Sequence, residues 1–67
     1  MKYWKLRGKI REIYKTEEAF AKTMGWSSSQ LSRRLSGGIR WNEGDMKKAM
    51  TALGCEISQV CEYFFED

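Results

Sequence analysis

Apolar residues recur at helical spacing along nearly the whole chain, and the sequence contains no proline. A period near 3.6 residues is typical of amphipathic helices and not of strands. Five short helices are expected, over about 4–14, 16–25, 27–36, 42–54 and 58–65. The pattern therefore predicts a single all-α, compact five-helix domain over residues 1–67.

Helical spacing also predicts which side chains face the core. The inward sets are Leu6, Ile10, Ile13 and Tyr14; Phe20, Ala21 and Met24; Leu31 and Leu35; Met46, Ala49, Met50 and Leu53; and Ile57, Val60, Cys61 and Phe64. In the last helix, Tyr63 and Phe65 are expected to point elsewhere.

Polar caps and glycine mark the helix ends. Thr16 and Asn42 are suitable N-caps, because their side chains can accept hydrogen bonds from the first turn. Ser27 followed by Gln30 has the spacing of a capping box. Gly25 is expected to end the second helix in the left-handed conformation.

The tryptophans raise the question of a nucleic-acid stacking platform. Trp26 and Trp41, however, each precede a helix cap, where an apolar residue can pack against Leu31 and Met46 as a hydrophobic staple. Core packing is therefore the favoured role for these two, while the role of Trp4 stays open.

The second and third helices meet with almost no linker. A tight corner needs a small contact residue and a positive-φ residue, which Ala21 and Gly25 supply, and Leu31 closes the small core between the helices. This stretch resembles the helix-turn-helix of the Cro/CI-type phage repressor family, whose pattern matches Ala21, Gly25, Trp26, Ser27, Leu31, Ser32 and Arg33.

The resemblance covers nearly the whole chain. It implies a lambda-repressor-like fold with a helix-turn-helix at about 17–36, and a sequence-specific, double-stranded DNA-binding transcriptional regulator of phage or prophage type, acting as a repressor. Two positions depart from the family pattern: Trp26 replaces an aliphatic residue, and Arg34 stands where an apolar residue is usual. Leu35 can fill that space, and solvent, a phosphate or an intramolecular carboxylate remain open as partners of Arg34.

The third helix carries a serine-rich face. At about 100° per residue, an arc of about 140° separate from the core-facing leucines holds Ser28, Ser29, Ser32, Arg33 and Ser36. Short hydroxyl side chains let a helix approach base edges in the major groove, and a guanidinium can bond both O6 and N7 of guanine. We therefore expect Arg33 to be the main base-contacting residue.

The family resemblance implies base contacts for Ser28, Ser29, Ser32 and Arg33. Ser27, beside the helix N-terminus, would suit a phosphate. Arg40, in the following loop, and basic residues near the N-terminus are further candidates for backbone contacts. Capping alone could explain Ser27, and solvation alone could explain the basic residues.

Charge is distributed unevenly. Residues 1–40 carry ten Lys and Arg against three Glu, whereas residues 41–67 carry two Lys against six acidic residues. A basic half favours a polyanionic partner. The apolar runs are too short to span a membrane or form a signal peptide, so a cytoplasmic location is expected.

Little supports catalysis, a metal site or a cofactor. The chain has no histidine, and Cys55 and Cys61 do not have a zinc-binding spacing. We expect two reduced thiols, at least one packed in the core; a redox switch and an intermolecular disulfide are the alternatives. An enzyme is not expected, and neither a small-molecule ligand nor a metal is indicated.

Two questions about partners stay open at the sequence level. One recognition helix contacts only a few base pairs, so a homodimer on a two-fold operator is expected. Its surface could involve Tyr63, Phe64 and Phe65, or the turn between the fourth and fifth helices. The alternative function is a protein-interaction module, such as an antitoxin or accessory factor with the same fold.

Overall fold

The computed structural model describes residues 2–65, and within this range all regular structure is helical. The elements are α1 (Trp4–Tyr14), α2 (Glu17–Met24), α3 (Ser28–Ser36), α4 (Glu43–Ala52), the 3₁₀ turn η1 (Ile57–Gln59) and α5 (Val60–Phe64). The all-α, five-helix prediction is confirmed. The first four helices lie within about two residues of their expected bounds, and only the last differs in kind.

The expected caps are present. The Thr16 hydroxyl accepts a hydrogen bond from the N–H of Ala19 at 3.1 Å, and the Asn42 carboxamide oxygen accepts one from the N–H of Asp45 at 2.7 Å. Each bond satisfies a donor that the first turn of a helix would otherwise leave without a partner. The helix starts are therefore determined locally.

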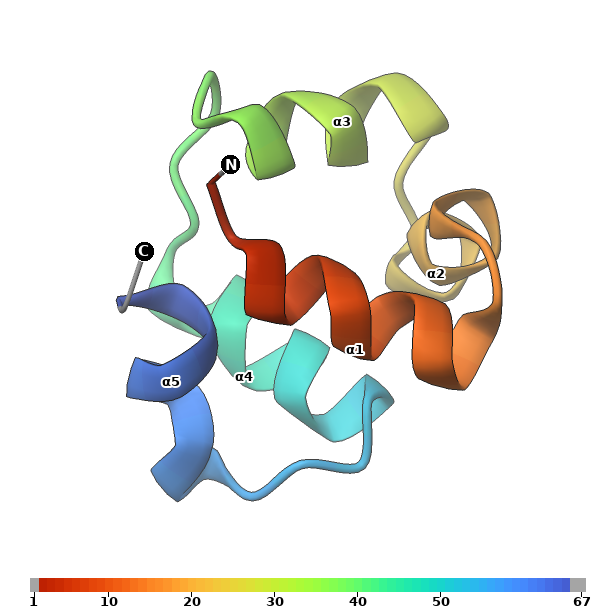
Figure 1. Cartoon of the computed structure of the whole chain (residues 1–67). Coiled ribbons are helices and arrows are strands. Elements are labelled where there is room, and N and C mark those ends of the chain that lie inside the picture. The colour runs from red at the N-terminus through yellow and green to blue at the C-terminus, as the bar shows by residue number, and fades with distance from the viewer. Residues whose placement is uncertain (1, 66–67) are drawn as a thin grey trace.

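The helices pack around one core (Figure 1). α1 crosses the middle of the molecule and packs against α2 and α5, while α4 packs against α2, η1 and α5. α3 lies along one side and packs on α2. The outer side of α3 is consequently not covered by another helix.

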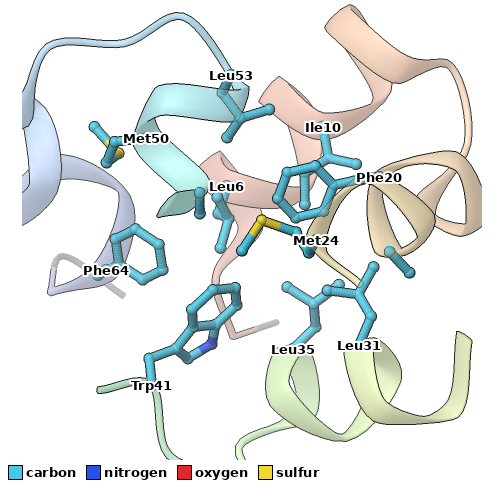
Figure 2. Packing of buried hydrophobic residues seen from close by; sticks show 12 residues of the cluster. Leu6, Ile10, Phe20, Met24, Leu31, Leu35, Trp41, Met50, Leu53 and Phe64 are labelled. Atoms are coloured by element: carbon cyan, nitrogen blue, oxygen red, sulfur yellow. The ribbon is translucent and has the colours of Figure 1, made fainter. Parts of the chain in front are cut away.

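Side chains from every helix meet in the interior (Figure 2). The buried set is Leu6, Ile10, Phe20, Ala21, Met24, Leu31, Leu35, Trp41, Ala49, Met50, Leu53 and Phe64, and no polar side chain among residues 2–65 is buried with them. Trp26 packs against this core, and its ring centroid lies 5.5 Å from that of Trp41 in an edge-to-face arrangement. The core role expected for both tryptophans is confirmed.

The C-terminal segment differs from its prediction. A single helix over 58–65 was expected, with Ile57, Val60, Cys61 and Phe64 inward, but the 3₁₀ turn precedes a helix of only five residues. Of the expected set only Phe64 is buried; Ile57 and Cys61 are exposed. Since residues three apart eclipse in a 3₁₀ turn, the helical period used for the prediction does not apply there.

Ile13 and Tyr63 differ from their expected positions, and the two cysteines differ from each other. Ile13 is 44% exposed, because α5 lies beside the N-terminal turns of α1 and does not cover this side of its last turn (Figure 1). Tyr63 packs against the core instead of pointing away from it. Both cysteines are free thiols: Cys55 packs against the core, as expected for at least one of them, and Cys61 is exposed.

Candidate nucleic-acid interface

The corner between α2 and α3 has a defined hydrogen-bond pattern. The N–H of Trp26 donates to the carbonyl of Ala21 at 2.8 Å, and the N–H of Gly25 donates to the carbonyl of Lys22 at 3.1 Å. Gly25 adopts φ +80°, where a side chain is disfavoured. This pair of bonds is a Schellman motif, which ends α2 and turns the chain directly into α3.

α3 has two distinct faces. Leu31 and Leu35 are buried against the core, whereas the residues predicted to contact bases, Ser28, Ser29, Ser32 and Arg33, are all exposed. The structure thus brings these four residues together on the outer face of one helix. Ser36, on the same arc, donates its hydroxyl hydrogen bond to the carbonyl of Arg33 at 3.1 Å.

Ser27 forms the predicted capping box. Its hydroxyl oxygen accepts from the N–H of Gln30 at 3.1 Å, and the Gln30 side-chain oxygen accepts from the N–H of Ser27 at 2.9 Å. A serine hydroxyl also has one proton to donate. Capping and a phosphate contact are therefore compatible at Ser27.

Arg34 makes the contact that the sequence left undecided. Its Nη1 lies 2.7 Å from Asp45 Oδ2, with only 16% and 20% of the two side chains exposed. The guanidinium carbon also lies 4.1 Å from the ring centroid of Trp26, a cation–π arrangement. The two departures from the family pattern, Trp26 and Arg34, are thus each other's partners, and Arg34 is directed to Asp45 of α4.

Two further side chains fix the end of α3. Arg7 of α1 donates to the carbonyl of Leu35 at 3.1 Å and forms an ion pair with Glu17 at 3.6 Å. The indole N–H of Trp41 donates to the carbonyl of Arg34 at 3.2 Å. Both donors satisfy carbonyls in the last turn of α3 from its inner side, so the outer face stays open.

Basic side chains flank both ends of α3. Arg40 is exposed in the loop after the helix, where its carbonyl lies 3.5 Å from Arg34 Nη1. Lys2 lies against the turn at Gly37, with its Cε 3.0 Å from where a Cβ on Gly37 would stand. At the other end, Lys22 lines a surface hollow together with Ser27 and Ser28.

Arg40 was expected from the sequence as a phosphate contact, but neither Lys2 nor Lys22 was predicted individually. Exposure at helical spacing on α2 could have indicated Lys22, but the position of Lys2 depends on how α1 packs. Arg7, by contrast, is one of the N-terminal basic residues that were candidates for backbone contacts or for a solvated surface, and its side chain is instead bonded within the fold.

Other site classes find little support among the described residues. No group of three or more Cys, Asp or Glu in residues 2–65 could hold a metal ion. No helix in that range is long and apolar enough to cross a membrane. The nearby carboxylate of Glu12 raises the pKa of Lys9. The pKa of Tyr63 is also raised, mainly by burial and secondly by the neighbouring Cys55. Neither Lys9 nor Tyr63 belongs to α3.

Comparison with known proteins shows which family the chain belongs to. The model of a family described as "Protein of unknown function (DUF739)" matches residues 1–67. The chain belongs to the DUF739 family. Among curated proteins, none matches the chain.

A solved structure extends this result. The DUF739 chain is similar to the modulator of repression (MOR) of the temperate bacteriophage TP901-1 from Lactococcus lactis, with 33% sequence identity and a TM-score of 0.85. The match covers 96% of this chain and 86% of that one. The helical fold is therefore shared with a small phage regulatory protein.

Proposed function

We propose that this protein is a phage-type regulator of transcription that binds double-stranded DNA sequence-specifically and places α3 in the major groove. The observation that carries the proposal is the outer face of α3, where Ser28, Ser29, Ser32 and Arg33 are exposed above the buried Leu31 and Leu35. The similarity to a phage modulator of repression supports a regulatory role and not an enzymatic one.

Each exposed residue has a role that its chemistry supports. Arg33 donates two parallel hydrogen bonds to O6 and N7 of a guanine, and the small serines allow the helix axis to approach the bases. The Ser27 hydroxyl and the N-terminus of α3 bind one phosphate.

Three cations flank this face. Lys22 of α2, beside the start of α3, and Arg40 and Lys2, near the end of α3, contact phosphates of the two strands. Phosphate contacts of this kind supply affinity and fix the orientation of the helix, while the base contacts select the sequence.

A second candidate function is supported by one observation. The similar phage protein is named a modulator of repression, and a modulator can act on a repressor protein as well as on an operator. Only one arginine, Arg33, is directed outward from α3, because Arg34 is paired with Asp45. The same serine-rich face could therefore bind a protein surface.

Selection of duplexes from a random pool, followed by fluorescence anisotropy over a salt series, separates the two functions. DNA binding predicts an enriched sequence, and the three phosphate-contacting cations Lys2, Lys22 and Arg40 predict a slope of about −3 in a plot of log K against log salt per bound chain. A protein-binding function predicts no enriched sequence and equally weak binding to all duplexes.

A further inference from the structure

One arginine side chain joins the residues before α1 to the end of α3. The Nε of Arg7 donates to the carbonyl of Lys2 at 3.1 Å, and its Nη2 donates to the carbonyl of Leu35 at 3.1 Å. Its Nη1 lies 3.6 Å from a carboxylate oxygen of Glu17, which is too long for a hydrogen bond. The two carbonyls are therefore the closer partners of the guanidinium.

Lys2 is also held against α3 by its own side chain. The chain before α1 runs up to the end of α3 (Figure 1), and the Cδ and Cε of Lys2 lie 3.1 and 3.0 Å from where a Cβ on Gly37 would stand. Gly37 has no side chain, so the lysine stem fits over it. The residue as a whole is exposed. Lys2 is thus a cation of restricted position beside the end of the serine-rich helix.

The backbone between Lys2 and α1 is fixed as well. Tyr3 adopts φ +56°, which is uncommon for a residue other than glycine. Its ring lies edge-to-face against Trp41 and Phe64, with centroid distances of 6.3 and 6.2 Å. Unfavourable backbone conformations persist where the surrounding contacts require them. The ring of Tyr3 and the guanidinium of Arg7 together direct Lys2 to α3.

We propose that Arg7 is a positioning residue for DNA binding: it holds Lys2 beside the end of α3, so that Lys2 contacts a phosphate while α3 lies in the major groove. The proposal rests on the proposed function. A direct phosphate contact suits Arg7 less, because only 24% of its side chain is exposed and its N–H groups already donate within the fold.

The advantage of this arrangement is that the phosphate contact and the base contacts move together. The last carbonyls of a helix have no partner within it, and Arg7 supplies one for Leu35. The same guanidinium fixes the Lys2 carbonyl. A long cationic side chain that is ordered before binding loses less entropy on the phosphate than a freely moving one.

Arg7→Lys separates positioning from charge. A lysine keeps the positive charge but lacks the planar fork that bonds two carbonyls at once. If Arg7 contributes only charge, the slope of log K against log salt on the enriched duplex stays at the wild-type value of about −3. Positioning instead predicts a slope of about −2, as for Lys2→Gln, because the phosphate contact of Lys2 is lost in both variants.

Two further variants complete this experiment, which uses fluorescence anisotropy over a salt series. Adding Lys2→Gln to Arg7→Lys should lower the slope no further, since one contact is removed by either change. Arg11→Lys, the same substitution at an exposed position one turn later in α1, should keep the wild-type slope. Far-ultraviolet circular dichroism verifies that each variant is folded under the binding conditions.

Nuclear magnetic resonance tests the anchoring without DNA. The ¹⁵N order parameter of the Lys2 amide should be near 0.8 in the wild type and fall below about 0.6 in Arg7→Lys. Equal order in the two proteins would overturn the proposal. A wild-type salt slope for Arg7→Lys, or a further loss of slope in the double variant, would also overturn it and leave the proposed function intact. A wild type that enriches no duplex would overturn the proposed function, and this proposal with it, before any variant is compared.

Discussion

The corner between α2 and α3 and the segment from Cys55 to Phe65 are fixed in different ways. The corner is held by local hydrogen bonds, namely a Schellman motif at Gly25 and a capping box between Ser27 and Gln30. The C-terminal segment contains the 3₁₀ turn η1 and then a helix of five residues, which is too short to be stable without packing.

The two regions also expose opposite kinds of surface. α3 buries its leucines and presents hydroxyls and a guanidinium, whereas the C-terminal segment buries one aromatic residue, Phe64, and leaves Ile57 and Phe65 exposed. A face of short polar side chains suits nucleic acid, and an exposed apolar surface suits protein. The polar surface thus lies on α3, whose position is set by local hydrogen bonds. The apolar surface lies on the C-terminal segment, whose structure depends on packing.

The largest expected effect contrasts a core residue of α3 with an exposed residue of η1. Leu35→Ala should lower the free energy of unfolding by about 3 kcal/mol, because the side chain is fully buried and its loss leaves a cavity. Ile57→Ala should change it by less than about 0.5 kcal/mol in dilute solution. Urea denaturation at low protein concentration measures the free energy of unfolding of both variants. Similar losses for the two would contradict the buried position of Leu35 and the exposed position of Ile57.

A smaller effect is expected at the contact between α3 and α4. Arg34→Ala should cost about 2 kcal/mol of stability, because Asp45 is left largely desolvated without its partner. Arg33→Ala, the neighbouring exposed residue, is the matched control and should change stability by less than about 0.5 kcal/mol.

Asp45→Asn added to Arg34→Ala should cost less than the sum of the two single changes, since both remove one interaction. Thermal unfolding followed by circular dichroism measures the stability of Arg34→Ala, Asp45→Asn, the double variant and the control Arg33→Ala. Additive losses would mean that the ion pair does not stabilise the position of α3.

The smallest stability effect concerns two glycines. Gly25→Ala should cost about 1 kcal/mol, because φ +80° strains any residue with a Cβ although no atom lies within 4 Å of it. Gly8→Ala, inside α1 and equally unobstructed, should raise stability by about 0.5 to 1 kcal/mol. The opposite signs are the diagnostic result; a loss at both positions would indicate crowding instead of backbone strain.

The sequence predicted the locally determined parts of this fold. Caps at Thr16, Ser27 and Asn42 are set by neighbours three residues away, so the first four helices could be placed without tertiary information. The exposed face of α3 followed from the same periodicity.

What the sequence did not predict depends on distant partners. The pairing of Arg34 with Asp45 across eleven positions, the use of Arg7 inside the fold and the approach of Lys2 to Gly37 all require the packed arrangement of helices. The exposure of Ile57 was missed because a short 3₁₀ turn does not follow the helical period.

The central claim is that α3 selects a DNA sequence through Arg33. The direct test compares Arg33→Ala with Arg40→Ala by fluorescence anisotropy, on an enriched duplex and on a scrambled one. Arg33→Ala should lose about 1 to 3 kcal/mol of binding free energy on the enriched duplex and little on the scrambled one, whereas Arg40→Ala should lose equally on both and lower the salt slope by about 1. Equal losses for Arg33→Ala on both duplexes, or no enriched duplex at all, would contradict the claim.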